Sequence, residues 1–180
     1  MKKLGIITRQ DFDPSESGIF YDDFGIREAS RAVLLNDVGQ VFLMNVQLHG
    51  YHKLPGGGID AGESKEEALA RELLEEVGTS LTIEAELGLV IEYRTTPWTG
   101  LERMKQISYC YLARQRGEQI PSKLEESEIA EHMIEVKAKS INHAIDLLKA
   151  DKPDNIEGKF IQRRDLLFLL EAKKLIANLT

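Results

Sequence analysis

The sequence predicts an α/β (α+β) fold in which a mixed β-sheet is covered by helices in layers. Strand-like runs outnumber helical runs along the chain, and their order is not a simple alternation of strand and helix. One run in the middle of the chain has the spacing of an amphipathic helix, whose apolar face needs a surface to pack on. A sheet that carries helices satisfies these observations together.

The strand candidates before the first helix are short. Apolar, β-rich residues flank the turn-forming stretch Asn36-Asp37-Val38-Gly39, and this pattern predicts a hairpin. Pro55 and the three glycines that follow it end the next extended piece. The candidates in this part of the chain are 3–8, 18–21, 30–35, 40–45 and 51–54.

Strand-like runs return after the central helix. The first of them is expected to bend near Gly88, and Ser140 is expected to cap a helix that reaches about Ala150. The last helical run is apolar on more than one side, so it either packs entirely in the core or also serves a homodimer. The candidates are strands at 81–95, 105–113 and 129–136, and helices at 140–150 and 160–176.

Length and composition set limits on the class of protein. A chain of 180 residues, 42% of them hydrophobic, can bury one core, so we expect a single domain over residues 1–180. A net charge of −7 would repel polymeric nucleic acid. A single cysteine, Cys110, cannot form an internal disulfide and fits a reducing compartment. Without a signal-peptide core or a membrane span, the protein is expected to be cytoplasmic.

The stretch GGGIDAGESKEEALARELLEEVG, residues 56–78, predicts a glycine loop followed by one helix. Ser64 with Glu67 forms a capping box, and Gly78 supplies a left-handed stop, so the helix is expected over about 65–77. At about 100° per residue, the apolar side chains fall on one face and the carboxylates on another, with Ala68 among the carboxylates. The apolar face is Leu69, Ala70, Leu73, Leu74 and Val77; the acidic face is Glu72, Glu75 and Glu76.

The acidic face is poorly placed for helix stability. Glu72 and Glu76 repel each other, and Glu75 and Glu76 meet the negative end of the helix dipole, at a cost of about 0.3 to 1 kcal/mol each. Arg71 cannot neutralise the whole group. A hard divalent cation such as Mg²⁺ or Mn²⁺ would convert this repulsion into attraction. The alternative is that these glutamates only face solvent.

The spacing of these residues favours the metal. Gly57, Glu63 and the run Arg71-Glu72-Leu73-Leu74-Glu75-Glu76-Val77-Gly78 resemble the signature of the Nudix hydrolases, a MutT-like family, over residues 57–79. The preceding Leu54-Pro55-Gly56-Gly57 also resembles the family's lead-in. Two positions depart: Thr79 replaces an aliphatic residue, and His52 stands where a tryptophan is frequent.

The resemblance implies an α/β/α sandwich and an enzyme that hydrolyses a nucleoside diphosphate linked to another moiety, with Mg²⁺ or Mn²⁺ as cofactor. By resemblance, Glu75 and Glu76 are metal ligands and Glu72 is a third ligand or the base. Glu63 assists through a second metal or water, and Arg71 organises the ligand helix. A pyrophosphate is already anionic, so attack by water needs cations to neutralise its oxygens.

The glycines have two readings that are compatible with each other. Gly56, Gly57 and Gly58 let the backbone approach the metal or the substrate phosphates, or they form a loop that needs positive φ.

The sequence also leaves the identity of the catalytic base open. Besides Glu72, the candidates lie in the stretch KLEESEIAE, whose other reading is an exposed acidic loop. They are Glu125, Glu126, Glu128 and Glu131.

Few residues in the sequence bear on the identity of the substrate. Trp98 either stacks on a nucleobase, folds back on the core or rims a dimer, and Arg94, Arg103 and Lys105 are candidates for binding phosphate. Neither Pro97 nor Tyr93 falls at the position that marks a known subclass. The competing function is a Nudix-fold module that binds or senses a nucleotide with little or no turnover.

Overall fold

The computed structural model describes residues 1–16, 25–94 and 103–178. The strand candidate at 18–21 and Trp98 therefore lie outside the described residues. The strands are β1 (Lys3–Ile7), β2 (Gly25–Leu35), β3 (Val41–Val46), β4 (Tyr51–Lys53), β5 (Gly56–Gly58), β6 (Ser80–Arg94), β7 (Met104–Arg116) and β8 (Met133–Ala138). The helices are the short 3₁₀ helix Arg9–Asp11, α1 (Lys65–Glu76), α2 (Glu126–Ala130), α3 (Ile141–Ala150) and α4 (Ile156–Ala177).

One mixed sheet forms the middle of the molecule. Its strands follow the order β1-β6-β7-β2-β3-β4, with β5 paired to β2 and β8 paired to β3. β2 runs parallel to β7, and β1 runs parallel to β6, whereas the other pairs are antiparallel. The predicted hairpin is present, because the Asn36 amide donates to the Gln40 carbonyl at 3.0 Å and Leu35 pairs with Val41.

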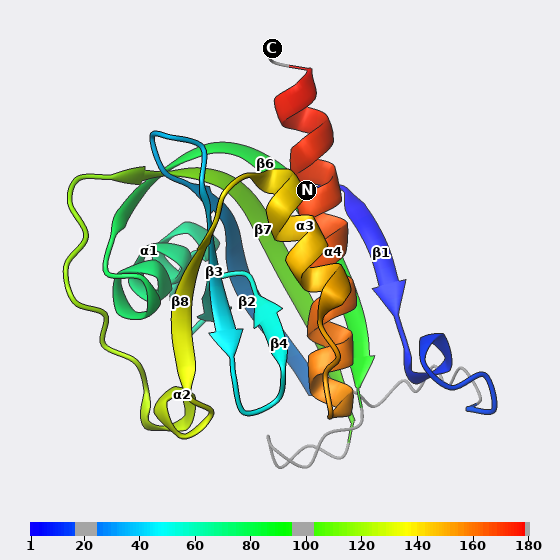
Figure 1. Ribbon diagram of the computed structural model, residues 1–180. Helices are drawn as coiled ribbons and strands as arrows, with labels where there is room; N and C mark the ends of the chain where they lie inside the picture. The colour runs from blue at the N-terminus through cyan, green and yellow to red at the C-terminus, as the bar shows by residue number, and fades with distance from the viewer. Residues whose placement is uncertain (17–24, 95–102, 179–180) are drawn as a thin grey trace.

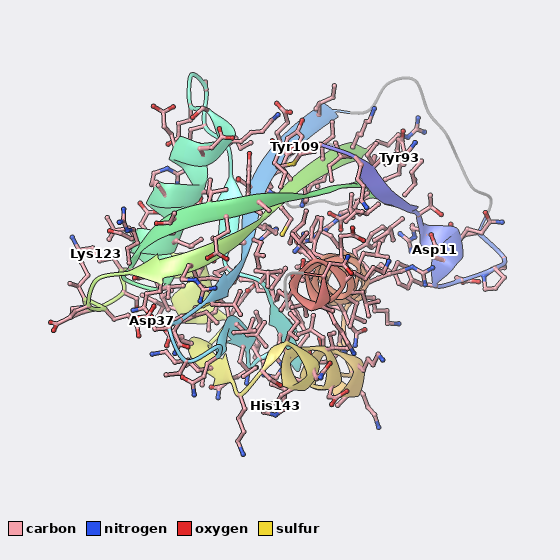
Figure 2. All side chains as sticks on the ribbon, turned by 90° about the horizontal axis from the view of Figure 1, so that it is seen from above. Asp11, Asp37, Tyr93, Tyr109, Lys123 and His143 are labelled. Carbon is pink, nitrogen blue, oxygen red and sulfur yellow. The ribbon has the colours of Figure 1, made fainter. Side chains whose placement is uncertain are left out.

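Helices cover the sheet on both sides. Seen from above, α1 lies on one side of the long strands, while α3 and α4 lie on the other (Figures 1 and 2). The side chains of β2 alternate between the two layers: Val33 and Leu35 join the core under α3 and α4, whereas Ala32 and Leu34 join the core under α1. The predicted sandwich of helix, mixed sheet and helix is confirmed.

The central helix begins as predicted. The Ser64 hydroxyl accepts from the Glu67 amide at 3.2 Å, and the Glu67 carboxylate accepts from the Ser64 amide at 2.9 Å. The predicted apolar face was wrong in two members, because only a narrow stripe of α1 touches the sheet. Ala70 and Leu74 are exposed, and Ala68, assigned to the acidic face, is fully buried.

Other boundaries differ from the sequence prediction for local reasons. Residues 129–136 do not form one strand, because the Glu128 carboxylate accepts from the Glu125 amide and starts α2, so that β8 begins only at Met133. α4 begins at Ile156 rather than near 160, because Asn155 caps it. The predicted bend at Gly88 is present as a register shift, where a Cβ would lie 2.7 Å from the Lys2 carbonyl.

The apolar final helix is largely accounted for by the core. Its own residues Phe160, Phe168 and Leu169 are buried in the core, and Leu170 is 40% exposed. Its contribution to a homodimer stays a prediction. Among the described residues, no helix combines the length and the apolarity needed to cross a membrane.

Candidate active site

The glycine stretch is a strand rather than the predicted loop, and it places the acidic helix. β5 pairs antiparallel with β2, with Arg31 opposite Gly56 and Ser30 opposite Gly57. The Gly56 amide donates to Glu76 Oε2 at 2.6 Å, so the end of α1 is tied to this strand. Glu76 is only 2% exposed, which makes it a buried carboxylate at the base of the site.

Gly57 has no room for a side chain. A Cβ at this position would lie 2.3 Å from Glu72 Oε2, so only glycine lets the Glu72 carboxylate rest on the strand. Gly56 is constrained differently. Its φ of +124° and a Cβ position 2.3 Å from the Ser30 carbonyl oxygen both exclude an ordinary residue. The need for positive φ therefore applies at Gly56, and the approach of the backbone to a metal or to substrate phosphates stays a prediction.

Arg71 joins the carboxylates of α1 to the loop before it. Its Nε donates to Glu63 Oε1 at 2.8 Å, its Nη1 to Glu72 Oε1 at 2.8 Å, and its Nη2 to the Gly58 carbonyl at 3.0 Å. The bonds from Arg71, with the Asp60 amide, lower the pKa of Glu63 to about 2. Arg71 lies where an organising residue is expected, and that role stays a prediction.

A second acidic segment faces the helix. Glu125, Glu128 and Glu131, from α2 and its flanks, line the same pocket as Glu72 and Glu76. Burial, followed by the charge of Glu76, raises the pKa of Glu128 to about 7 and also raises the pKa of Glu72. These carboxylates lack sufficient positive charge around them.

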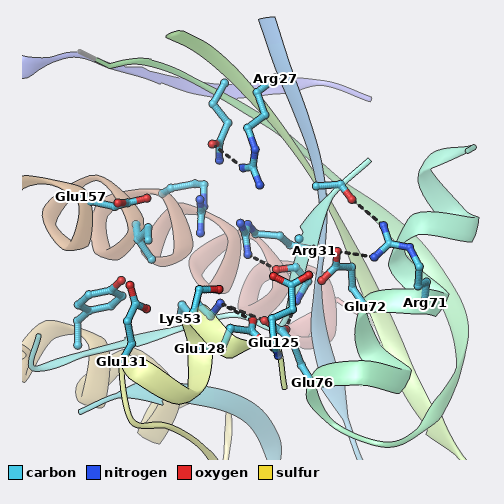
Figure 3. A pocket seen from close by; sticks show the side chains of 18 of the residues that line it. Arg27, Arg31, Lys53, Arg71, Glu72, Glu76, Glu125, Glu128, Glu131 and Glu157 are labelled. Atoms are coloured by element: carbon cyan, nitrogen blue, oxygen red, sulfur yellow. Dashed lines mark hydrogen bonds and ion pairs between the residues drawn. The ribbon is translucent and has the colours of Figure 1, made fainter. Parts of the chain in front are cut away.

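Lys53 supplies part of that charge. Its Nζ lies 3.0 Å from Glu76 Oε1 and 3.7 Å from Glu128 Oε1 (Figure 3). Within the described part of the chain, no three His, Cys, Asp or Glu side chains form a ready-made metal cage. Mg²⁺ seldom needs one, because it usually takes one or two carboxylates together with waters and substrate phosphates. The oxygen donors of Glu72, Glu76 and Glu128 fit such an ion.

Basic residues line the rest of the pocket, which encloses about 390 Å³. Arg27 and Arg31 come from β2, Arg94 from β6 and Arg164 from α4. In Figure 3, Arg27 lies on the opposite side of the pocket from Glu76, Glu125 and Glu128. The pocket therefore has a carboxylate wall and an arginine wall, an arrangement suited to a metal ion at one end and substrate anions at the other.

Comparison with known proteins identifies the family. A family model of the NUDIX domain matches residues 25–156. The chain belongs to the NUDIX family. A putative 8-oxo-dGTP diphosphatase of Bacillus subtilis is 40% identical over 57 residues, which is 32% of this chain and 38% of that protein. An RNA pyrophosphohydrolase of Klebsiella pneumoniae is 48% identical over 61 residues, 33% of this chain and 34% of that protein.

The chain therefore spans little more than a third of the length of these curated relatives. Among solved structures, the E. coli ORF135 protein matches with a TM-score of 0.57 and 18% identity, over 86% of this chain and 94% of that one. A match of such low identity supports the fold alone. It agrees with the sandwich of helices and mixed sheet described above.

The fold brings most of the predicted Nudix site residues together. The pocket is lined by Gly56, Gly57, Gly58, Arg71, Glu72, Glu76 and Arg94. Glu63 and Glu75 are absent from that lining among the described residues, and both contact Arg71, Glu75 at 3.4 Å. Glu126 does not line the pocket, in contrast to the other three late glutamates.

The residues predicted to bind substrate differ in where the structure places them. Arg94 lines the pocket but is 5% exposed, and it binds Glu92 Oε1 at 2.5 Å and Glu157 Oε1 at 3.2 Å. Arg103 is not among the lining residues, and its carbonyl accepts from the Gly25 amide at 3.1 Å. Trp98 lies outside the described residues, so base stacking by it stays a prediction.

Sequence reasoning missed several lining residues, namely Arg27, Arg31, Lys53, Gln106 and Arg164. A signal for two of them was present. Arg27 and Arg31 are four residues apart in a strand, so they point to the same face, with Ala29 between them. The signal was hidden because the strand was expected to begin only at residue 30, whereas β2 begins at Gly25.

Proposed function

We propose that the protein is a Mg²⁺-dependent, or Mn²⁺-dependent, Nudix pyrophosphohydrolase that cleaves the pyrophosphate linkage of a nucleoside diphosphate derivative by attack of water. The observation that carries this proposal is the convergence of Glu72, Glu76 and Glu128 beside the glycine strand β5. Carboxylates that are buried together are tolerated when a cation completes the group. The names of the relatives, both phosphoanhydride hydrolases, support the same reaction class.

The residues have distinct tasks in this proposal. Glu76, fixed by the Gly56 amide, and Glu72, fixed by Arg71, would hold the metal ion, with Glu128 facing them. When bound, the metal would neutralise charge on the phosphoryl oxygens and lower the pKa of a water. The bare strand of Gly57 and Gly58 lets the diphosphate approach the carboxylates closely. Arg71 orients Glu72 through the hydrogen bond from its Nη1 to Glu72 Oε1.

The base that accepts the proton of the attacking water is assigned to a carboxylate of this pocket. Glu72, Glu125, Glu128 and Glu131 line the pocket and remain candidates. Glu126 is the weakest of these candidates, because it does not line the pocket. Replacing each by Gln should lower kcat by about a hundredfold or more for the base and change it little for the others.

Metal-dependent turnover is the decisive test. The protein would be incubated with nucleoside triphosphates, oxidised nucleotides, nucleotide sugars, ADP-ribose and dinucleoside polyphosphates, with Mg²⁺, Mn²⁺ or EDTA. Products that need the metal and disappear in Glu76→Gln, but persist in the matched α2 variant Glu126→Gln, support the hydrolase. Tight nucleotide binding without products across the panel would instead support the binding or sensing module.

Two further expectations accompany this function. We propose that the partner is a small nucleotide and not a nucleic-acid polymer or a membrane, in keeping with the net charge of −7. A cytoplasmic location stays a prediction. Size-exclusion chromatography with light scattering tests the predicted homodimer.

A further inference from the structure

The arginine wall holds more positive charge than its own carboxylates balance. Three of its members are buried: Arg164 is 0% exposed, Arg94 5% and Arg31 6%. Burying a guanidinium is unfavourable unless an anion and hydrogen-bond acceptors replace the water it loses. The partners of each arginine therefore show where an anion from outside is needed.

Arg31 is the least compensated of the four. Its Nη1 donates to the carbonyl oxygens of Gly56 at 2.5 Å and Leu54 at 3.4 Å, both of which are uncharged acceptors. Its Nε has no acceptor among the described residues. No carboxylate in the described ranges lies within ion-pair distance of it, and burial, followed by the charge of Arg164, lowers its pKa to about 10.

Arg27 lies four residues before Arg31 on strand β2. It too has no carboxylate partner within the described residues. Its Nη1 donates to Gln106 Oε1 at 3.0 Å, and Gln106 in turn donates to Ser108 Oγ at 3.0 Å. This chain of neutral groups holds the guanidinium in one orientation, next to Gly58. Burial and the charges of Arg94 and Arg164 lower the pKa of Arg27.

Arg94 and Arg164 differ, because carboxylates already balance them. Arg164 donates to Asp165 Oδ1 at 2.7 Å and lies 3.5 Å from Glu92 Oε2, and Arg94 binds Glu92 and Glu157. Arg94 Nε and Arg164 Nη2 lack acceptors in the part of the chain that the structure describes, but each of these two guanidinium groups has a carboxylate partner. The charge left without a partner is therefore that of Arg27 and Arg31.

We propose that Arg27 and Arg31 bind a phosphate of the substrate beyond the scissile diphosphate, so that the enzyme prefers nucleotides whose phosphate chain is longer than a diphosphate. The inference rests on the proposed function, since it places the scissile diphosphate at the carboxylate wall. Arg27 lies across the pocket from Glu76 and Glu128 in Figure 3, so a group that contacts it is distinct from one held by those carboxylates.

The charge distribution favours a phosphate over a neutral sugar at this position. A sugar hydroxyl would leave the charges of Arg27 and Arg31 without an anion, whereas a phosphate can accept from guanidinium groups and offset the repulsion between them. The neutral nucleoside has a separate place. Tyr51 and Ile161 line the pocket beside Glu131 and Glu157, whose charges would repel a phosphate there.

Binding to the metal-loaded protein tests this proposal, because in the proposed function the metal holds a diphosphate at the carboxylate wall. Wild-type protein with Mg²⁺ would be titrated calorimetrically with tripolyphosphate and pyrophosphate, each supplied as its non-hydrolysable imido analogue. Tripolyphosphate should bind most tightly. Arg27→Gln should weaken tripolyphosphate binding by about ten- to a hundredfold, the effect expected when hydrogen bonds to a charged group are lost. The affinity for pyrophosphate should change much less. Arg31→Lys, which retains the buried charge, should weaken tripolyphosphate binding to an intermediate degree.

The matched control is Arg163→Gln, which removes an exposed arginine next to Arg164 that pairs with Asp11 at 3.0 Å outside the pocket. It should leave every affinity unchanged. Equal affinity of wild type and Arg27→Gln for tripolyphosphate, or an equal loss for pyrophosphate, would overturn the inference. Because no turnover is measured, such a result leaves the proposed hydrolysis standing, and a failure to find hydrolysis leaves this binding test interpretable.

Discussion

At the scale of a single residue, the absence of a side chain at Gly57 leaves room for the Glu72 carboxylate. Its backbone does not require positive φ, so alanine fits the strand, yet the new Cβ would lie 2.3 Å from the Glu72 carboxylate. That carboxylate is the far end of a flexible side chain and can move away. We predict that Gly57→Ala lowers kcat by about a hundredfold, because a shift of about 1 Å misplaces Glu72.

The stability of Gly57→Ala should change little, with a melting temperature within about 2 °C of wild type. Gly56→Ala provides the contrast. Its Cβ would meet the Ser30 carbonyl oxygen at 2.3 Å, a backbone atom that cannot rotate away, and its φ is +124°. This variant should lose about 2 to 4 kcal/mol in urea denaturation. A Gly57→Ala protein as unstable as Gly56→Ala would contradict the distinction.

At the scale of elements, an ion network joins β6 to α4. The fully buried Glu92 carboxylate accepts from Arg94 Nη2 at 2.5 Å and lies 3.5 Å from Arg164 Nη1. Glu92→Gln would leave two buried guanidinium groups short of an anion. We predict a loss of about 3 kcal/mol in the free energy of unfolding, measured by urea denaturation.

A matched control lies on the same strand. Glu84 pairs with Arg114 at 2.6 Å, but both side chains are more than a third exposed, Glu84 at 34% and Arg114 at 41%. Glu84→Gln should therefore change the free energy of unfolding by less than about 0.5 kcal/mol. Similar losses in the two variants would mean that the network of Glu92 contributes no more than a surface pair.

The same network predicts how stability depends on pH. Burial opposes ionisation of Glu92, but Arg94 and Arg164 outweigh it and hold the pKa of the carboxyl below its usual value. A depressed folded-state pKa stabilises the protein above the unfolded value of about 4.3 and loses that contribution as the pH falls through the folded value. The stability difference between wild type and Glu92→Gln should shrink below about pH 4. A constant difference from pH 7 to pH 3 would contradict this.

Local signals in the sequence determined some elements better than others. The limits of α1 and the hairpin at Asn36 were predictable, because capping and turn residues act within a few positions. The start of β2 was not, since its pairing with β7 from Gly25 onward depends on residues far along the chain. The spacing of the carboxylates predicted the acidic wall. The arginine wall needed the assembled fold, because its members come from β2, β6 and α4.

At the scale of the whole molecule, the charge is divided more sharply than the net value of −7 indicates. Glu72, Glu76 and Glu128 lie together at one wall, and burial with the charge of Glu76 raises the pKa values of Glu72 and Glu128. This strain belongs to the folded state, because the unfolded chain separates these residues. A cation that binds between them should therefore stabilise folding directly, apart from any effect on catalysis.

We predict that Mg²⁺ raises the melting temperature of the protein in the absence of nucleotide. A concentration ten times the dissociation constant stabilises the fold by about 1.4 kcal/mol, which corresponds to about 2 to 5 °C for a chain of this size. Scanning calorimetry with and without EDTA measures the shift. Glu76→Gln should reduce it strongly, and Glu126→Gln, outside the pocket, should retain it. NaCl at matched ionic strength separates binding from screening, and an equal shift with NaCl would mean that no metal site forms without substrate.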